Sequence, residues 1–192
     1  MNNSKKGFTL VELLIVIAIL AILSVAVVLV LNPAELIKQS RDSTRISDMA
    51  AINSAIALYL TDVASPGLGG ASNASCASAK YNCTNSTTTA PFNGGATTCT
   101  NANFATTTVD GTGWVSVALS GVSAGAPISR LPIDPVNSAA YMYAYGCNLL
   151  NYKLGTVMES SKYGSASTGY MRNAYDGGSA NGWYEVGNSL SL

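Results

Sequence analysis

The pattern of hydrophobic and polar positions divides the chain into an apolar N-terminal block, an amphipathic stretch and a largely polar remainder. Between residues 13 and 31, only Ser24 interrupts a run of Leu, Ile, Val and Ala. An α-helix rises 1.5 Å per residue, so about 20 apolar residues cover the hydrocarbon core of a bilayer. Residues 8–31 are therefore predicted to form a helix long enough to span a membrane.

Residues 32–63 keep a helical period but become amphipathic. Pro33 kinks a helix when it lies in the interior and is tolerated when it lies in the first turn, so both outcomes stay open. Pro66 and Gly67 then mark an end. We expect one long helix over residues 8–62. Its second half has an apolar face made of Met49, Ile52, Ile56, Tyr59, Leu60 and Val63.

Four charged residues, Arg41, Asp42, Arg45 and Asp48, lie close together at the start of the amphipathic stretch. Their spacing allows ion pairs between neighbouring turns, and such pairs contribute little on an exposed helix. We interpret these residues as a solvated face and not as a site.

The rest of the chain predicts a long polar excursion followed by a small antiparallel sheet. Residues 65–108 are rich in Ser, Thr, Asn, Gly and Ala and lack periodicity, which is typical of a surface loop. The fold class is therefore predicted to be α+β, with the helix packed on the sheet. Strand patterns follow at residues 114–119, 141–145, 152–159 and 183–186, with a turn within residues 146–151.

Tyrosines at positions 141, 143 and 145 alternate along one predicted strand and so share one face. Such a face can serve adhesion or contacts between subunits, or it can pack against the helix with its hydroxyls in water. We favour packing, because tyrosine has an apolar body and a polar tip.

Composition favours a structural protein over an enzyme. The chain has no histidine, which excludes histidine-dependent triads, dyads and metal sites. Ten basic and ten acidic residues balance, so no basic footprint for nucleic acid is present. No catalytic residues and no cofactor are predicted.

The four cysteines, Cys76, Cys83, Cys99 and Cys147, predict two disulfides in an extracytoplasmic domain with little aliphatic core. Three pairings are possible. We favour Cys76 with Cys83, which closes a local loop, and Cys99 with Cys147, which ties the polar excursion to the sheet. A zinc site is the rival, although the spacing contains no Cys-x-x-Cys pair.

The junction between the polar start and the apolar block has three interpretations. A secretory signal has a shorter core that ends in a small-x-small cleavage site, which residues 31–35 lack. A plain single-pass anchor explains the length and the lysines but leaves Gly7, Phe8 and Glu12 unexplained. In the third interpretation, the run Lys-Lys-Gly-Phe-Thr-Leu-Val-Glu-Leu at residues 5–13 resembles the class III leader of type IV pilins and type II secretion pseudopilins.

This resemblance implies a role for each matching residue. A prepilin peptidase would cut after Gly7 and N-methylate Phe8. Glu12 would pair with the terminal amine of a neighbouring subunit and set the register of assembly, because a carboxylate at low dielectric gains from a nearby cation. The alternative is that Glu12 simply reaches the lipid headgroups.

The resemblance also bears on the C-terminal half. A Pro-x-Asp-Pro segment at residues 132–135 before a tyrosine-rich strand is loosely similar to the globular region of the major pseudopilins, some of which use a C-terminal calcium loop. Asp134, Asp176 and Glu185 are weak candidates for Ca²⁺ ligands, since hard cations take oxygen ligands. The alternative for these residues is turn chemistry, because Asp is common before Gly or Pro.

Together these observations predict a pilin-like subunit with three parts: a cleaved leader at residues 1–7, a long helix at 8–62 whose residues 8–31 span the membrane, and a globular domain at 63–192. The basic end would stay cytoplasmic and the rest would lie outside. We expect a homo-oligomeric filament that is built at an inner-membrane assembly platform and presented at the cell surface. A type II secretion pseudopilin is the first alternative, and a membrane-anchored binding domain is the second.

Overall fold

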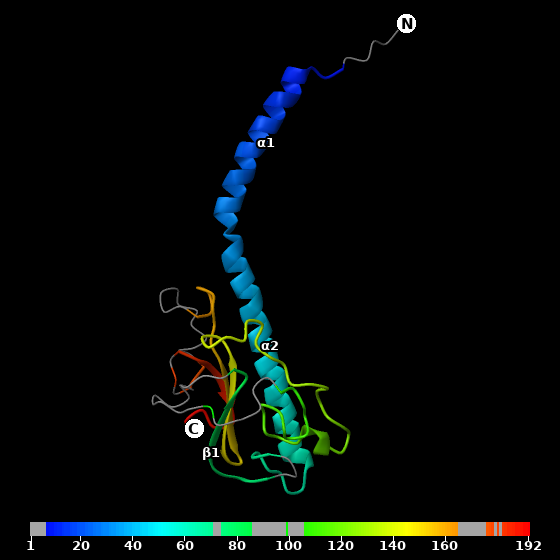
Figure 1. The fold of residues 1–192 in the computed structure, drawn as a ribbon, viewed down its shortest axis with the longest axis vertical. Coiled ribbons are helices and arrows are strands. Elements are labelled where there is room, and N and C mark those ends of the chain that lie inside the picture. The colour runs from blue at the N-terminus through cyan, green and yellow to red at the C-terminus, as the bar shows by residue number, and fades with distance from the viewer. Residues whose placement is uncertain are drawn as a thin grey trace. The chain divides into compact units, whose positions relative to one another are not determined.

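The computed structural model describes residues 7–70, 74–85, 99, 106–164, 176–178, 180 and 182–192. The chain forms two compact units, Met1–Ile37 and Lys38–Leu192, which we describe separately. Helix α1 (Leu10–Leu31) lies in the first unit, and helix α2 (Pro33–Asp62) begins there and continues into the second. Figure 1 shows the course of both helices.

The predicted single helix over residues 8–62 is interrupted at Asn32. This residue has φ 40° and ψ 72°, a left-handed conformation that ends α1. Asparagine tolerates that conformation better than most residues. Pro33 then occupies the first position of α2, where its missing N–H group is not needed. The carbonyl of Asn32 accepts hydrogen bonds from the N–H groups of Glu35 and Leu36, so the second helix starts without a gap.

In the second unit, the predicted apolar face of α2 packs on the sheet. Met49, Ile52, Ile56 and Tyr59 are fully buried, and Leu60 and Val63 are partly buried against the same cluster. The cluster includes strand residues from the sheet and the segment 114–122. The helical period thus predicted this contact correctly, because burial on one side of a helix requires apolar residues three and four apart.

The sheet has four antiparallel strands in the order β1-β2-β3-β4. The fold class is therefore α+β, as predicted. Strands β2 (Tyr143–Leu149) and β3 (Asn151–Thr156) form the expected hairpin, and β4 (Tyr184–Gly187) pairs with β3. The hairpin turns tightly at Leu149, which has φ 56°.

Strand β1 (Cys76–Cys83) falls in the stretch that we expected to be a surface loop, so that expectation is wrong for these residues. The segment Cys-Ala-Ser-Ala-Lys-Tyr-Asn-Cys contains few strand-forming residues. Its strand conformation comes from pairing with β2, from Cys76 opposite Leu149 to Cys83 opposite Ala144. This pairing is non-local and leaves no signal in the local sequence.

Alternation along β2 divides the core between the two faces of the sheet. Tyr143 and Tyr145 belong to the cluster on the α2 side, whereas Met142 and Ala144 belong to a smaller cluster on the other face. The smaller cluster also contains Tyr81, Cys83, Cys99, Ala180 and Trp183.

The predicted strand at residues 114–119 does not form. Residues 114–118 contribute a single bridge, between Asp110 and Ala118, and a short 3-10 helix, η2 (Leu119–Gly121), follows. The segment is apolar because Trp114, Val115, Val117 and Leu119 all enter the core. A buried loop can therefore imitate a strand pattern, since burial and not pairing selects these residues.

The predicted disulfide pairing is also wrong. The structure pairs Cys76 with Cys147 and Cys83 with Cys99. The reason is geometric: Cys76 and Cys83 are the two ends of strand β1 and lie opposite Leu149 and Ala144 of β2, so they are roughly 17 Å apart at 3.3 Å per residue. Disulfides need Cα atoms within about 7 Å. All four cysteines are bonded, which contradicts the zinc alternative.

Candidate functional site

The residues that the sequence singled out for processing, Gly7 and Phe8, lie directly before α1. Thr9 is the N-cap of this helix. The Glu12 N–H donates to the Thr9 hydroxyl at 3.2 Å, and the Glu12 carboxylate accepts from the Thr9 N–H and hydroxyl, each at 2.8 Å. This reciprocal capping box satisfies two backbone donors that a helix start otherwise leaves free. The Thr-x-x-Glu spacing is a readable capping signal that the sequence analysis missed.

Gly7 and Phe8 are not packed against other residues of the chain. A Cβ atom built on Gly7 would meet nothing within 4 Å, so the space around it does not require glycine. The Phe8 side chain is 86% exposed. Both residues are therefore accessible to an enzyme or to another chain.

Helix α1 presents apolar side chains on all sides. Residues Leu10–Val28 form a helical segment long and apolar enough to cross a membrane, and none of that segment is buried by the rest of the chain. Within α1, Glu12 is the single charged residue. An exposed apolar surface of this extent marks a membrane or protein contact.

The charged residues at the start of the amphipathic stretch do not form a solvated face. Asp42 and Arg45 are fully buried, so that interpretation is wrong for both. The Arg45 guanidinium bonds both oxygens of Asp134, at 2.6 and 2.9 Å, and also contacts Asp42 at 2.8 Å and Glu159 at 2.6 Å. Burial alone would lower the pKa of Arg45, but its bonds to Asp134 and the other two carboxylates raise it instead. The guanidinium stays charged at any pH at which the protein folds.

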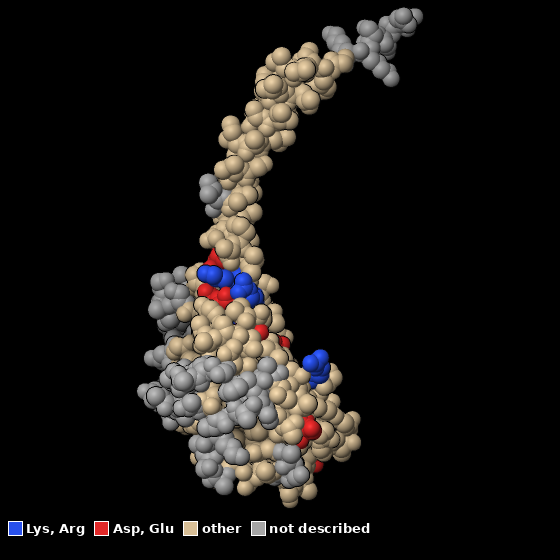
Figure 2. Space-filling view, in the orientation of Figure 1, with Lys and Arg blue, Asp and Glu red and all other residues tan. Residues whose placement is uncertain are grey.

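These contacts join α2 to two loops of the second unit. Asp134 also accepts the N–H groups of Val136 and Asn137 at 2.8 and 3.0 Å. Asp42 accepts the N–H and hydroxyl of Ser160 at 2.8 and 2.6 Å. Figure 2 shows basic and acidic side chains gathered at one end of the globular unit, where the surrounding surface is largely uncharged. The side chains of Asp42, Arg45, Asp134 and Glu159 are themselves buried, and we call these four residues the Arg45 network.

The structure does not bring the three calcium candidates together. Asp134 is committed to Arg45, whereas Asp176 and Glu185 are neighbours: the Glu185 N–H donates to Asp176 at 2.6 Å. The Glu185 carboxylate pairs with Lys153 at 2.7 Å, and both side chains are fully buried. Burial raises the pKa of Asp176, against the lowering effect of its bonds to backbone N–H groups. Among the residues that the structure describes, no group of three or more His, Cys, Asp or Glu is arranged to hold a metal ion.

The tyrosine strand packs as we favoured, but its hydroxyls are not in water. Tyr143 and Tyr145 are fully buried. Tyr143 donates to the Asp48 carboxylate at 2.6 Å, and Tyr145 donates to the carbonyl of Leu68 at 2.8 Å. These residues hold the sheet against α2, so they are not available as an adhesive face.

Comparison with known proteins adds one finding to this geometry. Residues 2–28 match the model of the prokaryotic N-terminal methylation motif, and the match ends within α1. No curated protein and no solved structure matches the chain. The matched segment contains Gly7, Phe8 and Glu12 and most of the membrane-competent helix. Residues 2–28 therefore carry a class III prepilin leader, the signature of type IV pilins and pseudopilins.

Proposed function

We propose that this chain is a structural subunit of an extracellular type IV pilus-like filament. Prepilin peptidase cuts it between Gly7 and Phe8 and methylates the new terminus at Phe8. The observation that supports this most is the position of α1: a helix that is apolar on all sides begins at Leu10, within the matched segment and just after Gly7 and Phe8. Before assembly the helix lies in the cytoplasmic membrane, and afterwards it packs against α1 of other copies at the assembly platform.

Once α1 has left the lipid, packing against other copies keeps its apolar surface out of water; within the lipid itself, helix packing gains no such hydrophobic term. Removing apolar area from contact with water stabilises a contact by about 25 cal/mol per Å². The large apolar side chains of α1 that the structure describes are about half exposed or more in the isolated chain, with Leu10 at 79% and Ile22 at 72%. A repeated head-to-tail contact that does not close into a ring produces a filament.

The proposed role of Glu12 is to set the axial register between subunits. Once α1 leaves the lipid and enters a helix bundle, the Glu12 carboxylate is buried at low dielectric, and the capping contact with Thr9 brings no opposite charge to it. The methylated amine of Phe8 on a neighbouring copy supplies that charge. A subunit shifted along the filament axis would leave its Glu12 carboxylate buried without this amine. An unpaired buried carboxylate is costly, so such a subunit would assemble poorly.

Gly7 has its proposed role in recognition and not in the fold. No neighbouring atom would oppose a side chain at this position, so a substitution there leaves the folded chain undisturbed. An effect of Gly7→Leu on the processed mass would then report on the peptidase alone.

The test uses the producing cell, comparing sheared surface material with the membrane fraction by intact mass and N-terminal sequencing. Wild-type chain should begin at methylated Phe8 and appear in the sheared fraction. Glu12→Gln keeps the capping geometry, since Gln also serves at the third helical position, but removes the charge. Thr9→Val removes the side-chain cap and keeps the charge. Filament loss in Glu12→Gln with assembly retained in Thr9→Val supports the charge-pairing role.

Three results would separate the alternatives. Assembly retained in Glu12→Gln but lost in Thr9→Val would assign Glu12 to capping only. Processed chain that stays in the membrane fraction would indicate a pseudopilin instead of a surface filament. A chain that still begins at Met1 would overturn the proposal and leave a membrane-anchored domain.

A further inference from the structure

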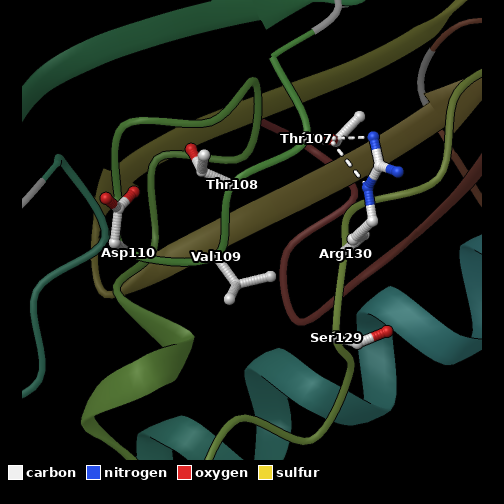
Figure 3. A pocket seen from close by; sticks show the side chains of 6 residues that line it. All are labelled: Thr107, Thr108, Val109, Asp110, Ser129 and Arg130. Carbon is white, nitrogen blue, oxygen red and sulfur yellow. Dashed lines mark hydrogen bonds between the residues drawn. The ribbon is translucent and has the colours of Figure 1, made fainter.

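The globular unit carries a shallow pocket that the filament proposal does not use. Two short segments of the chain line it: residues 107–110 and residues 129–130, with a volume of about 330 Å³. Figure 3 shows Arg130 and Thr107 on one side and Asp110 on the other, with Val109 between them. A volume near 300 Å³ is at the lower end of the range for small-molecule sites.

Backbone hydrogen bonds hold the lining in place. The carbonyl of Thr107 accepts from the N–H of Leu131 at 2.9 Å, and the carbonyl of Val109 accepts from Ser120 at 3.0 Å. A side chain at Gly113 would collide with the carbonyl oxygen of Thr108, so the backbone at Gly113 packs closely against the backbone at Thr108. The pocket is therefore already formed and needs no rearrangement to accept a ligand.

Arg130 supplies the positive charge of the pocket. Its Nε and Nη2 atoms donate to the Thr107 hydroxyl at 3.2 and 3.0 Å. Among the described residues, no carboxylate lies within ion-pair distance of Arg130, whereas Arg41, Arg45 and Lys153 each have at least one. A guanidinium has five N–H donors, so three remain to bind a carboxylate through two parallel hydrogen bonds.

The other side of the pocket offers hydrogen-bond acceptors and hydroxyl groups. Asp110 accepts the N–H and hydroxyl of Thr112 at 3.0 and 2.6 Å, and these bonds lower its pKa. It is thus an ionised acceptor at neutral pH. Thr108 and Ser129 are exposed at the rim and can both donate and accept. A ligand that fits this lining carries a carboxylate for Arg130 and hydroxyl groups for the remaining residues.

We propose that this pocket binds a sugar acid, such as one hexuronic acid unit of an acidic polysaccharide. The sugar carboxylate pairs with Arg130, the ring hydroxyls bond Asp110 and the rim hydroxyls, and the apolar ring face lies over Val109. A neutral sugar lacks the group for Arg130, and a simple anion lacks the hydroxyls. Specificity thus requires both features in one molecule. A single chain supplies all the lining residues of this site, so binding does not depend on filament assembly.

The test measures binding of glucuronate to the full-length chain in detergent micelles by saturation-transfer NMR, with glucose, acetate and inorganic phosphate as separate probes. In an open site we expect a dissociation constant on the order of 1 mM. Arg130→Gln should weaken glucuronate binding about tenfold or more, because a charge-assisted pair becomes a neutral contact. Lys162→Gln removes the same charge from an exposed residue outside the pocket and should leave binding unchanged.

The fluorescence of Trp114 and Trp183 establishes that Arg130→Gln is folded before its affinity is compared. Asp110→Asn provides a second test, since it should weaken glucuronate binding without creating affinity for acetate. Failure of glucuronate to bind, equal binding by the Arg130→Gln variant, or binding of acetate or phosphate as tight as that of glucuronate would overturn the proposal. None of these results bears on filament formation, which is measured in the sheared fraction.

Discussion

Replacing Arg45 with methionine is the sharpest test of how α2 is held in the globular unit. Methionine keeps the length and the apolar stem of arginine but removes the guanidinium. Arg45 has no exposed surface and contacts three carboxylates, of Asp42, Asp134 and Glu159. Removing one partner of a buried ion pair leaves uncompensated charge and costs about 3–5 kcal/mol. We expect Arg45→Met to lower the free energy of unfolding by that amount.

The matched control is Arg41→Met, one turn earlier on the same helix. The Arg41 side chain is 35% exposed and makes a single 2.9 Å contact with Glu159. Partly exposed pairs contribute about 0–1 kcal/mol. The two substitutions are chemically identical, so the difference between them measures the effect of burial and of the two additional carboxylates.

Urea unfolding of the full chain in detergent, followed by tryptophan fluorescence, is the assay. Trp114 and Trp183 lie in the globular unit and are both buried, so their emission reports its unfolding and not that of α1. A cycle with Asp134→Asn should show a coupling of about 0.5–3 kcal/mol, because the two side chains share two hydrogen bonds. If Arg45→Met cost no more than Arg41→Met, the Arg45 network would contribute nothing beyond surface pairing.

Three further predictions concern the pH dependence, the disulfides and the hairpin turn. Burial, and to a smaller extent the charge of Asp134, raises the pKa of Asp48. The protonated carboxyl therefore contributes to folding stability at low pH, and this contribution is lost as the pH rises through the pKa of Asp48 in the folded state. Asp48→Asn still accepts the Tyr143 hydroxyl and should be more stable than wild type at pH 7 but not at pH 3; an equal effect at both would refute this reasoning. In the chain-entropy model, the Cys76–Cys147 disulfide closes a loop of 71 residues and stabilises the fold by about 4.4 kcal/mol, whereas the Cys83–Cys99 disulfide closes a loop of 16 residues and contributes about 3.1 kcal/mol. Cys147→Ser should therefore lower the melting temperature more than Cys99→Ser. Leu149 has φ 56° in an exposed turn, and Leu149→Asn should stabilise by about 1 kcal/mol in the same urea assay, where any loss would argue against strain.

Local patterns were sufficient to locate the helical region and strands β2, β3 and β4. The period of the apolar residues from Met49 to Tyr59 identified the buried face of α2, since a helix repeats every 3.6 residues wherever it packs. The alternation of Tyr143 and Tyr145 identified β2, because successive side chains of a strand point to opposite faces of the sheet. Pro33 was read correctly as a possible helix start, but choosing between a start and a kink required the left-handed conformation of Asn32.

Patterns failed where a residue's partner is distant in the sequence. The chain around Cys76 and Cys83 is a strand because β2 lies beside it, and the same pairing determines which cysteines meet. The burial of Arg45 depends on Asp134, which is 89 positions away. A charged residue on a helix is usually solvated, so nothing in its neighbourhood predicted a buried network.

The N-terminal segment is the part of this protein that the sequence by itself determined. A basic start, Gly7-Phe8, Glu12 and an apolar block broken only by Ser24 form one contiguous signal, because processing and membrane insertion act on a linear segment. The tertiary structure decided the disulfide pairing, the position of β1, the Arg45 network and the pocket at Arg130. Each of these depends on groups brought together from separate parts of the chain, and their meeting is set by packing and strand pairing, which no local run of residues encodes.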